Sequence, residues 1–362
     1  MRKLLLGAVF AALLAGAAGA AEPEKLLSAT LPSGGEGGGR LIRTAEGLAL
    51  LDLKGLTPLE GRRAASRWNS DLVTPVEPGQ RWILGVEKPR TGGFMEPQKR
   101  GPLRLGDLNA ATTFPDVKPL YLHMAAWPYA AADGPDGSLL MVLWAKAPPF
   151  VTEPGYKLVL WSPTAPAKVA DWPEAWRDIG QGQLLADGQG GWRLLTKLGE
   201  EACGRSAGVA VLAISADLTV SEGEKLCLPA AYTAFTSEVL AGVATPTGPV
   251  WFVSGKSAGA HRLARINVTA AGLKSKPLAE LPAGEVASTA YDPASGDLYV
   301  AQDNGARLTR IDARGKTTDV DLPAPNCDGG KAGGKRSASL ATLDGRVHLA
   351  VTAGSCVNVW RF

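Results

Sequence analysis

Residue types on which several common functions depend are scarce in this 362-residue chain. Histidine occurs only three times and no His-Glu-x-x-His pattern is present, so a zinc hydrolase has few residues to build from. The formal net charge is only +3, from 38 basic and 35 acidic residues, which argues against nucleic acid or an anionic membrane as a partner. Beyond the N-terminal region, no apolar run reaches the roughly 18 residues of a membrane helix. We therefore expect no transmembrane segment in the mature chain.

Residues 1–20 have the three parts of a secretory signal peptide. A basic start at Arg2-Lys3 precedes an apolar run from Leu4 to Leu14, and the small residues Ala18-Gly19-Ala20 supply a cleavage site. Cleavage after Ala20 leaves residues 21–362 as the mature chain. This pattern predicts a periplasmic or secreted protein.

The four cysteines form two local pairs in the second half of the chain, Cys203 with Cys227 and Cys327 with Cys356. Disulfides form and persist in exported proteins, and pairing between neighbours closes loops of moderate length, each worth on the order of 3 kcal/mol. A zinc site is the alternative, but the short C-x-x-C spacing is missing. We therefore expect two disulfides with nearest-neighbour pairing.

A repeated order of strands and turns dominates the mature chain. The clearest copy spans 286–323, where four short strands alternate with Gly-containing turns in an antiparallel meander. Further copies lie at 237–282, 183–229, 138–172 and 80–115, while 41–53 begins the series and 346–361 ends it. Seven copies at a period of about 50 residues predict an all-β fold, a seven-bladed β-propeller of four-stranded meanders, with residues 21–362 as a single domain.

One stretch carries the strand–turn–strand pattern most clearly, Tyr291-Asp-Pro-Ala-Ser-Gly-Asp-Leu-Tyr-Val-Ala301. In it the chain resembles exported bacterial seven-bladed propellers with YVTN-type or NHL-type repeats. The resemblance covers the mature chain as architecture and identifies no single family. It departs from WD40 repeats, because the Trp-Asp pair that ends their blades is absent.

Two arrangements can close the predicted ring. Ser28 to Gly35 can form the innermost strand and turn of the first blade, which leaves a three-stranded last blade ending at Phe362. Alternatively, Lys25 to Pro32 supplies the outer strand of the last blade. The sequence favours the first arrangement, in which blade packing and a Cys327–Cys356 bond hold the ring.

Two motifs that resemble catalytic or nucleotide-binding signatures are better explained as loops. Ser206 and Ser257 stand in G-x-S-x-G patterns, but both lie between antiparallel strands with no helix after them, unlike a hydrolase nucleophile. Residues 329–336 nearly match a phosphate-binding loop, yet Arg336 replaces the required Ser or Thr. We interpret all three as surface features of the repeats.

The histidines and several tryptophans are interpreted as structural residues. The three histidines, His123, His261 and His348, are expected to be packing or surface residues. Trp82, Trp144 and Trp251 fall in second strands, where they can fill the space between blades.

Long loops point to a binding surface. In a four-stranded meander, the loops that join second and third strands share a face with the connections between blades, and here they are long: 88–102, 146–156, 198–208 and 255–261. Long loops on a rigid scaffold commonly carry function. The candidate binding residues are Arg90, Phe94, Met95, Lys99, Arg100, Phe150 and Tyr156, whose mixture of aromatic, Met and basic side chains suits an interface. The leading hypothesis is a noncatalytic propeller that binds an envelope protein or extracellular ligand here, with both disulfides on this face.

The alternative hypothesis is a calcium-dependent hydrolase. Residues at the starts of the predicted inner strands converge near the axis: Asn69, His123, Asp178, Glu238, Glu285 and Arg336. Asn69, Asp178, Glu238 and Glu285 could hold Ca²⁺ and activate water toward an ester or lactone, in a site similar to that of calcium-dependent lactonase propellers. A solvated polar channel, with Arg336 balancing the carboxylates, is the other interpretation. The sequence leaves open whether the protein is an enzyme and favours the binding protein.

Overall fold

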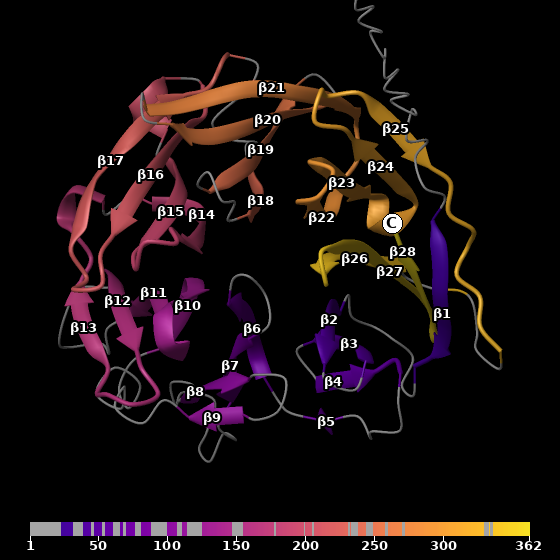
Figure 1. Cartoon of the computed structure of the whole chain (residues 1–362), viewed down its shortest axis with the longest axis horizontal. Coiled ribbons are helices and arrows are strands. Elements are labelled where there is room, and N and C mark those ends of the chain that lie inside the picture. The colour runs from indigo at the N-terminus through magenta and orange to yellow at the C-terminus, as the bar shows by residue number, and fades with distance from the viewer. Residues whose placement is uncertain are drawn as a thin grey trace, which may run out of the picture.

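The strands of this protein form seven four-stranded antiparallel sheets, counted over the described residues and arranged around a central axis (Figure 1). The structure is a computed structural model that describes residues 23–31, 39–44, 47–52, 55–60, 66–67, 70–76, 81–87, 100–106, 111–113, 125–146, 155–176, 179–198, 200–204, 206–230, 232, 238–243, 249–257, 260–269, 272–328, 333 and 336–362. Within this part of the chain, no helix has the length and apolar character needed to cross a membrane. The arrangement confirms the predicted β-propeller.

Each of the first three blades is a meander of four consecutive strands. Blade 1 contains β2 (Arg40–Thr44), β3 (Gly47–Asp52), β4 (Gly55–Pro58) and β5 (Ser66–Arg67). Blade 2 contains β6 (Ser70–Val76), β7 (Arg81–Glu87), β8 (Arg100–Gly106) and β9 (Ala111–Thr113). Blade 3 contains β10 (Ala125–Asp133), the short 3₁₀ helix η1 (Pro135–Gly137), β11 (Leu139–Lys146), β12 (Gly155–Trp161) and β13 (Lys168–Asp171).

Blades 4 to 6 repeat this order. Blade 4 follows η2 (Glu174–Trp176) and contains β14 (Ile179–Ala186), β15 (Trp192–Leu198), η3 (Glu200–Cys203), β16 (Gly208–Ile214) and β17 (Val220–Cys227). Blade 5 contains β18 (Glu238–Val243), β19 (Val250–Ser257), β20 (Ala260–Thr269) and β21 (Gly272–Pro282). Blade 6 contains β22 (Val286–Asp292), β23 (Asp297–Gln302), η4 (Asp303–Gly305), β24 (Arg307–Ile311) and β25 (Thr317–Val320).

The ring is closed by the strand nearest the N-terminus, which corrects the arrangement favoured by the sequence. Blade 7 contains β26 (Arg336–Leu343), β27 (Arg346–Ala353) and β28 (Cys356–Arg361), and β1 (Glu24–Thr30) is its outermost strand. β1 pairs antiparallel with β28, so the second sequence alternative is the correct one. The physical reason is that β28 would otherwise expose an unpaired edge, while β2 to β5 already complete blade 1.

The sequence copies at 138–172 and 80–115 begin after the first strand of their blades, although the starts of these two inner strands were predicted at His123 and Asn69. The two strands are β10 in blade 3 and β6 in blade 2. β10 has the sequence AAWPYAAAD, whose alanines and proline have low strand propensity. Its pairing with β11 shifts register between Pro128 and Ala130, a bulge that accommodates the proline. The copy at 138–172 is therefore too short, because the local composition of β10 gives a weak strand signal.

The core of the ring lies between blades, which explains the continuous apolar runs of the central strands. In β11, Leu140 and Val142 pack toward blade 4, and the intervening Met141 packs toward blade 2. Successive side chains of a strand point to opposite faces, so a strand buried on both sides reads as apolar throughout. The fully buried Trp251 of β19 packs between blades 4 and 5 and confirms its predicted role, whereas the side chains of Trp82 and Trp144 lie outside the described residues.

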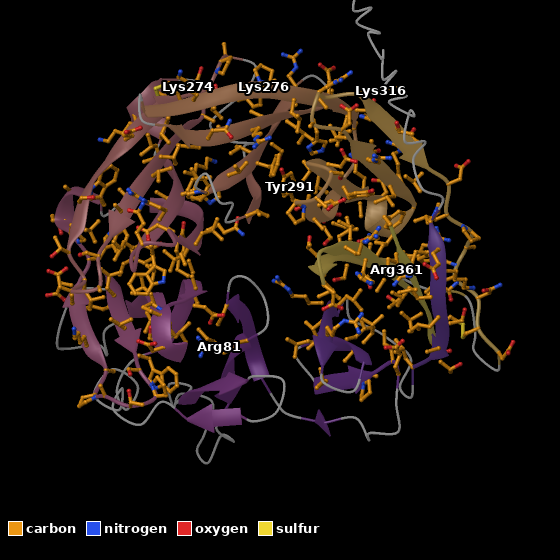
Figure 2. The ribbon with its side chains drawn as sticks, viewed as in Figure 1. Arg81, Lys274, Lys276, Tyr291, Lys316 and Arg361 are labelled. Carbon is orange, nitrogen blue, oxygen red and sulfur yellow. A yellow bond between two sulfur atoms is a disulfide. The ribbon has the colours of Figure 1, made fainter. Side chains whose placement is uncertain are left out.

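Asp133 links three successive blades. Arg81 of blade 2, labelled in Figure 2, donates from Nε to the Asp133 carboxylate at 2.7 Å and from Nη1 to the Gly137 carbonyl at 2.9 Å. Trp192 of blade 4 donates from Nε1 to the Asp133 carbonyl at 3.0 Å. Burial raises the pKa of the Asp133 carboxyl, and the Arg81 guanidinium opposes this shift. Apolar packing and partly buried hydrogen bonds therefore both hold neighbouring blades together.

Aspartates close several of the turns between strands. The Asp312 carboxylate accepts hydrogen bonds from the backbone N–H groups of Arg314 and Lys316, both at 2.9 Å. Asp187 accepts from Gln189 and Gly191 in the same way, at 2.8 and 3.0 Å. Such Asx turns explain why Asp stands at the start of these connections.

The Asp312 turn makes stability depend on pH. The backbone N–H of Lys316 and that of Arg314 lower the pKa of the Asp312 carboxyl, so its stabilisation is present above the ordinary pKa of about 3.9 and is lost as pH falls through the lower folded value. Asp312→Asn, which keeps an acceptor oxygen without titrating there, is expected to reduce the loss of stability on acidification. Urea midpoints measured from about pH 5 to about pH 2 test this. Asp321→Asn, at an exposed position outside the turn, should follow the wild type.

Candidate functional site

Strand direction determines which connections share a face of the ring. Each inner strand starts on the face that also carries the loop between second and third strands and the connection from the preceding blade. We call this the loop face. The aspartate-closed turns at 187–191 and 312–316 lie on the opposite face, because they join first to second and third to fourth strands.

The first disulfide fixes the loop-face end of blade 4. Cys203, at the end of η3, is bonded to Cys227, the last residue of β17, with 5.5 Å between their Cα atoms. Nearby, Ala207 N–H donates to the Tyr232 carbonyl at 2.6 Å, and Tyr232 Oη donates to the Leu263 carbonyl of blade 5 at 3.1 Å. The loop between β15 and β16 is therefore tied both to its own blade and to the next one.

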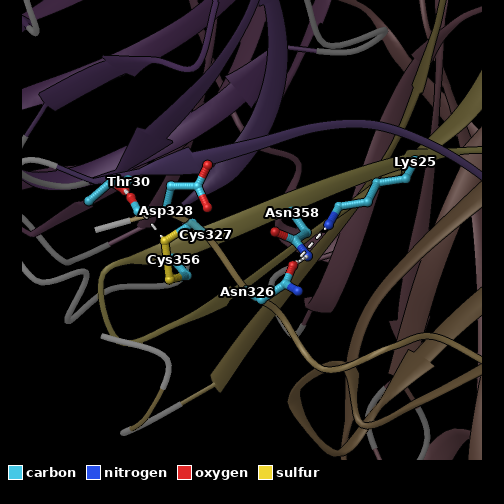
Figure 3. Close-up of a disulfide and its surroundings, with 7 residues drawn as sticks. All are labelled: Lys25, Thr30, Asn326, Cys327, Asp328, Cys356 and Asn358. Carbon is cyan, nitrogen blue, oxygen red and sulfur yellow. Dashed lines mark hydrogen bonds between the residues drawn. A yellow bond between two sulfur atoms is a disulfide. The ribbon is translucent and has the colours of Figure 1, made fainter. Parts of the chain in front are cut away.

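The second disulfide fixes the loop-face end of blade 7. Cys327, in the connection that follows β25, is bonded to Cys356 at the start of β28 (Figure 3). Thr30 of β1 donates from Oγ1 to the Asp328 carbonyl at 3.0 Å, and Lys25 of β1 donates from Nζ to Asn326 Oδ1 at 3.0 Å. The closing strand and the connection from blade 6 are thus held together around one disulfide.

These bonds confirm the predicted pairing and place both disulfides on the loop face. Peptide mapping of unreduced protein is expected to recover Cys203 with Cys227 and Cys327 with Cys356, with no free thiol. Recovery of a Cys227–Cys327 peptide would contradict the structure.

The predicted binding residues are placed only in part. Arg90, Phe94, Met95, Lys99 and Phe150 lie outside the described residues, and Arg100 begins β8 with its side chain outside them. Tyr156 begins β12 at the loop face and is half-buried. Its ring packs edge-on against Tyr129, 5.3 Å away between centroids, and burial raises the pKa of its phenol. This ring is part of the packing between blades 3 and 4.

Two of the predicted calcium ligands, Glu238 and Glu285, lie among the described residues. Glu238 begins β18 and Glu285 directly precedes β22. Asn69, His123 and Asp178 lie outside the described residues, as does the side chain of Glu238. Glu285 is exposed, and its backbone N–H donates to Asp303 Oδ1 at 3.2 Å. Across the described part of the chain, no three His, Cys, Asp or Glu side chains lie together as metal ligands would.

The remaining motifs have structural positions. Ser206 lies between β15 and β16 and Ser257 ends β19, so neither stands on a strand-to-helix turn. His261 and His348 are buried, at 3% and 1% exposure. Burial lowers the pKa of His348.

A buried polar cluster at the loop-face end of blades 5 and 6 was not predicted. It consists of His261, Gln302 and Arg307, all with a buried side-chain atom that makes no hydrogen bond to a described residue. His261 was predicted to be a packing or surface residue, and Gln302 is the last residue of β23, directly after Val300 and Ala301. The cluster depends on contacts between two blades, so no local pattern marks it.

Comparisons with known proteins bear on the fold. No family model matches this sequence, and no curated protein matches it. Among solved structures, a streptogramin B lyase is 10% identical, with 94% of this chain and 98% of that chain covered and a TM-score of 0.53. A prolyl endopeptidase is 13% identical over 89% of this chain and 46% of that one, with a TM-score of 0.49, so this chain spans less than half its length. A gluconolactonase from Xanthomonas campestris is 12% identical, with 80% and 97% covered and a TM-score of 0.40. The lyase match is evidence of a shared β-propeller fold.

Proposed function

We propose that this protein is a noncatalytic binding propeller, periplasmic or secreted, that presents its loop face to an envelope protein or an extracellular ligand. The observation that carries the proposal is the position of the two disulfides. Both lie on the loop face, and around each one, hydrogen bonds link neighbouring blades or the closing strand. On the opposite face, the turns at 187–191 and 312–316 are short and closed by a single aspartate.

Rigid connections favour binding because less conformational entropy is lost when a partner docks. A disulfide restricts the chain around it, and the Tyr232–Leu263 hydrogen bond crosses from blade 4 to blade 5. Disulfides are also typical of oxidising compartments, which agrees with the predicted signal peptide. These features support a preformed surface on the loop face.

Capture experiments with matched variants test this proposal. Immobilised wild-type protein is compared with a variant in which residues 90–99 are replaced by a short Gly-Ser linker, and with Gln189→Lys on the opposite face. We expect the linker variant to lose the envelope components that the wild type and Gln189→Lys retain. Identical capture by all three proteins, or loss only in Gln189→Lys, would contradict the proposal.

A calcium-dependent hydrolase is the second candidate, favoured by the strand starts. Glu238 begins β18 and Glu285 directly precedes β22, and both strands are the innermost of their blades (Figure 1). Carboxylate oxygens are preferred Ca²⁺ ligands. Calorimetric titration with Ca²⁺ is expected to show binding that Glu238→Gln weakens if this candidate is correct. Wild-type protein that binds no divalent cation at millimolar concentration would end it.

A further inference from the structure

The connection between blades 5 and 6 lies at the loop face. This connection runs from Pro282, the last residue of β21, to Glu285, which precedes β22. Gln302 donates from Nε2 to the Pro282 carbonyl at 3.1 Å, and His261 Nε2 contacts the Gly284 carbonyl. Two buried polar side chains, from different blades, therefore hold one connection by its carbonyl groups.

The strand register places the side chains of the cluster on facing sides of the two blades. Leu263 of β20 and Val300 of β23 belong to the same apolar cluster between blades 5 and 6. His261 and Gln302 are each two residues from these positions, so they point into the same interface. Arg307 pairs directly with Gln302 in the β23–β24 ladder and therefore projects from the same side of its sheet.

Hydrogen-bonding requirements determine what the cluster can bind. A carbonyl only accepts, so His261 Nε2 carries a proton, and in the tautomer protonated at Nε2 alone the Nδ1 atom is an acceptor. The Gln302 amide nitrogen faces Pro282, which leaves Oε1 as a second acceptor. Arg307 Nη1 is a donor, and none of these three buried atoms has a hydrogen-bond partner among the described residues. Leaving such a group unsatisfied costs about 1–3 kcal/mol.

The backbone beside the cluster is also unusual. Asp303, Asn304 and Gly305 follow Gln302 directly and have φ angles of 51°, 55° and 82°, all in the left-handed region. Non-glycine residues held there store strain, which concentrates at ligand-binding and active sites. Asp303 also closes onto the connection, because its N–H donates to the Glu285 carbonyl at 2.9 Å.

We propose that this cluster is a binding site for a hydroxyl group, either one bound water molecule or a hydroxyl of a neutral polyhydroxylated ligand. A water within reach of all three groups would donate to His261 Nδ1 and Gln302 Oε1 and accept from Arg307, while a ligand hydroxyl would donate to one acceptor and accept from Arg307. A carboxylate would be repelled by the two acceptors, and an ammonium group by Arg307. The ligand source rests on the proposed binding function, because a ligand would enter from the loop face. The water source does not rest on that function.

A crystal structure and calorimetry on the full chain test the site and separate the two sources. In crystals grown without any polyol, a density peak within hydrogen-bond distance of Gln302 Oε1 and His261 Nδ1 is the expected result for water. Calorimetric titration with glucitol is the probe for the ligand source. Gln302→Leu removes one acceptor at the site, and Gln189→Leu makes the same change on the opposite face.

The results of the titrations and the crystal structure distinguish the ligand source from the water source. Glucitol binding that is lost in Gln302→Leu and kept in Gln189→Leu supports the ligand source. Equal binding by both variants refutes that source, and the density peak then decides for or against water. Absence of both the density peak and glucitol binding overturns the proposal. If Gln302→Leu fails to fold, the crystals and the calorimetry of the wild-type protein still test it.

Discussion

Removal of residues 23–31 is expected to destabilise the protein by at least on the order of 4 kcal/mol, because the closing strand β1 is lost. Leu26, Leu27 and Leu31 pack partly buried against blades 1 and 7, and each contributes about 1 kcal/mol. The truncation also breaks the backbone ladder to β28 and the hydrogen bonds from Thr30 and Lys25. Denaturant unfolding of the truncated and full-length proteins measures the difference.

Addition of the missing strand as a peptide provides the control. A synthetic peptide of residues 23–31 should pair with the exposed edge of β28 and restore part of the lost stability, whereas a scrambled peptide should not. An unchanged unfolding midpoint in the truncated protein would show that ring closure by β1 contributes little.

Trp192→Ala is expected to lower the free energy of unfolding by about 3 to 5 kcal/mol, the range for truncating a buried tryptophan. Trp192 is 1% exposed, packs between blades 3 and 4, and donates from Nε1 to the Asp133 carbonyl at 3.0 Å. The substitution leaves a cavity and also removes the partner of a carbonyl in the turn that Arg81 binds. Thermal and denaturant unfolding give the measurement.

A comparison of two Trp→Phe variants separates the hydrogen bond from the packing. Trp251 is fully buried like Trp192, but its Nε1 makes no hydrogen bond to any described residue. Trp192→Phe should therefore be more destabilising than Trp251→Phe, by about 1 kcal/mol for the lost hydrogen bond. Equal effects of the two substitutions would show that the Trp192–Asp133 hydrogen bond adds nothing to stability.

The fold could be predicted from sequence to the extent that it depends on local pattern. Meanders with clear turns, such as the one from Val286 to Val320, were located correctly because their strands and turns are adjacent in the chain. The copy at 138–172 leaves out β10, whose start was predicted near His123, because alanines and Pro128 give this strand a weak local signal. The role of β1 could not be derived, since its strand partner β28 is about 330 residues away and both closures satisfied the local pattern.

The same distinction between local and long-range features applies to the candidate site. The disulfide pairing and the shared face followed from cysteine spacing and strand order, and the structure confirms both. The polar cluster could not be predicted from the sequence, because His261 and Gln302 are brought together only when blade 5 packs against blade 6. Sequence periodicity reports which side of a strand is buried, and it carries no information about which hydrogen bonds cross between sheets.

Ring closure by β1 also has a consequence for how the chain folds. Glu24 pairs with Arg361, 337 residues further along the chain, so the contacts of blade 7 have very high contact order. Six blades can form from neighbouring segments as the chain is made, but the seventh must wait for the final strand to appear. Until then, β1 is unpaired and its leucines, which the closed ring half-buries, are exposed, so this segment is prone to pair with another chain. We therefore expect the protein to need a chaperone transiently, until β28 is available to pair with β1, and not after it has folded.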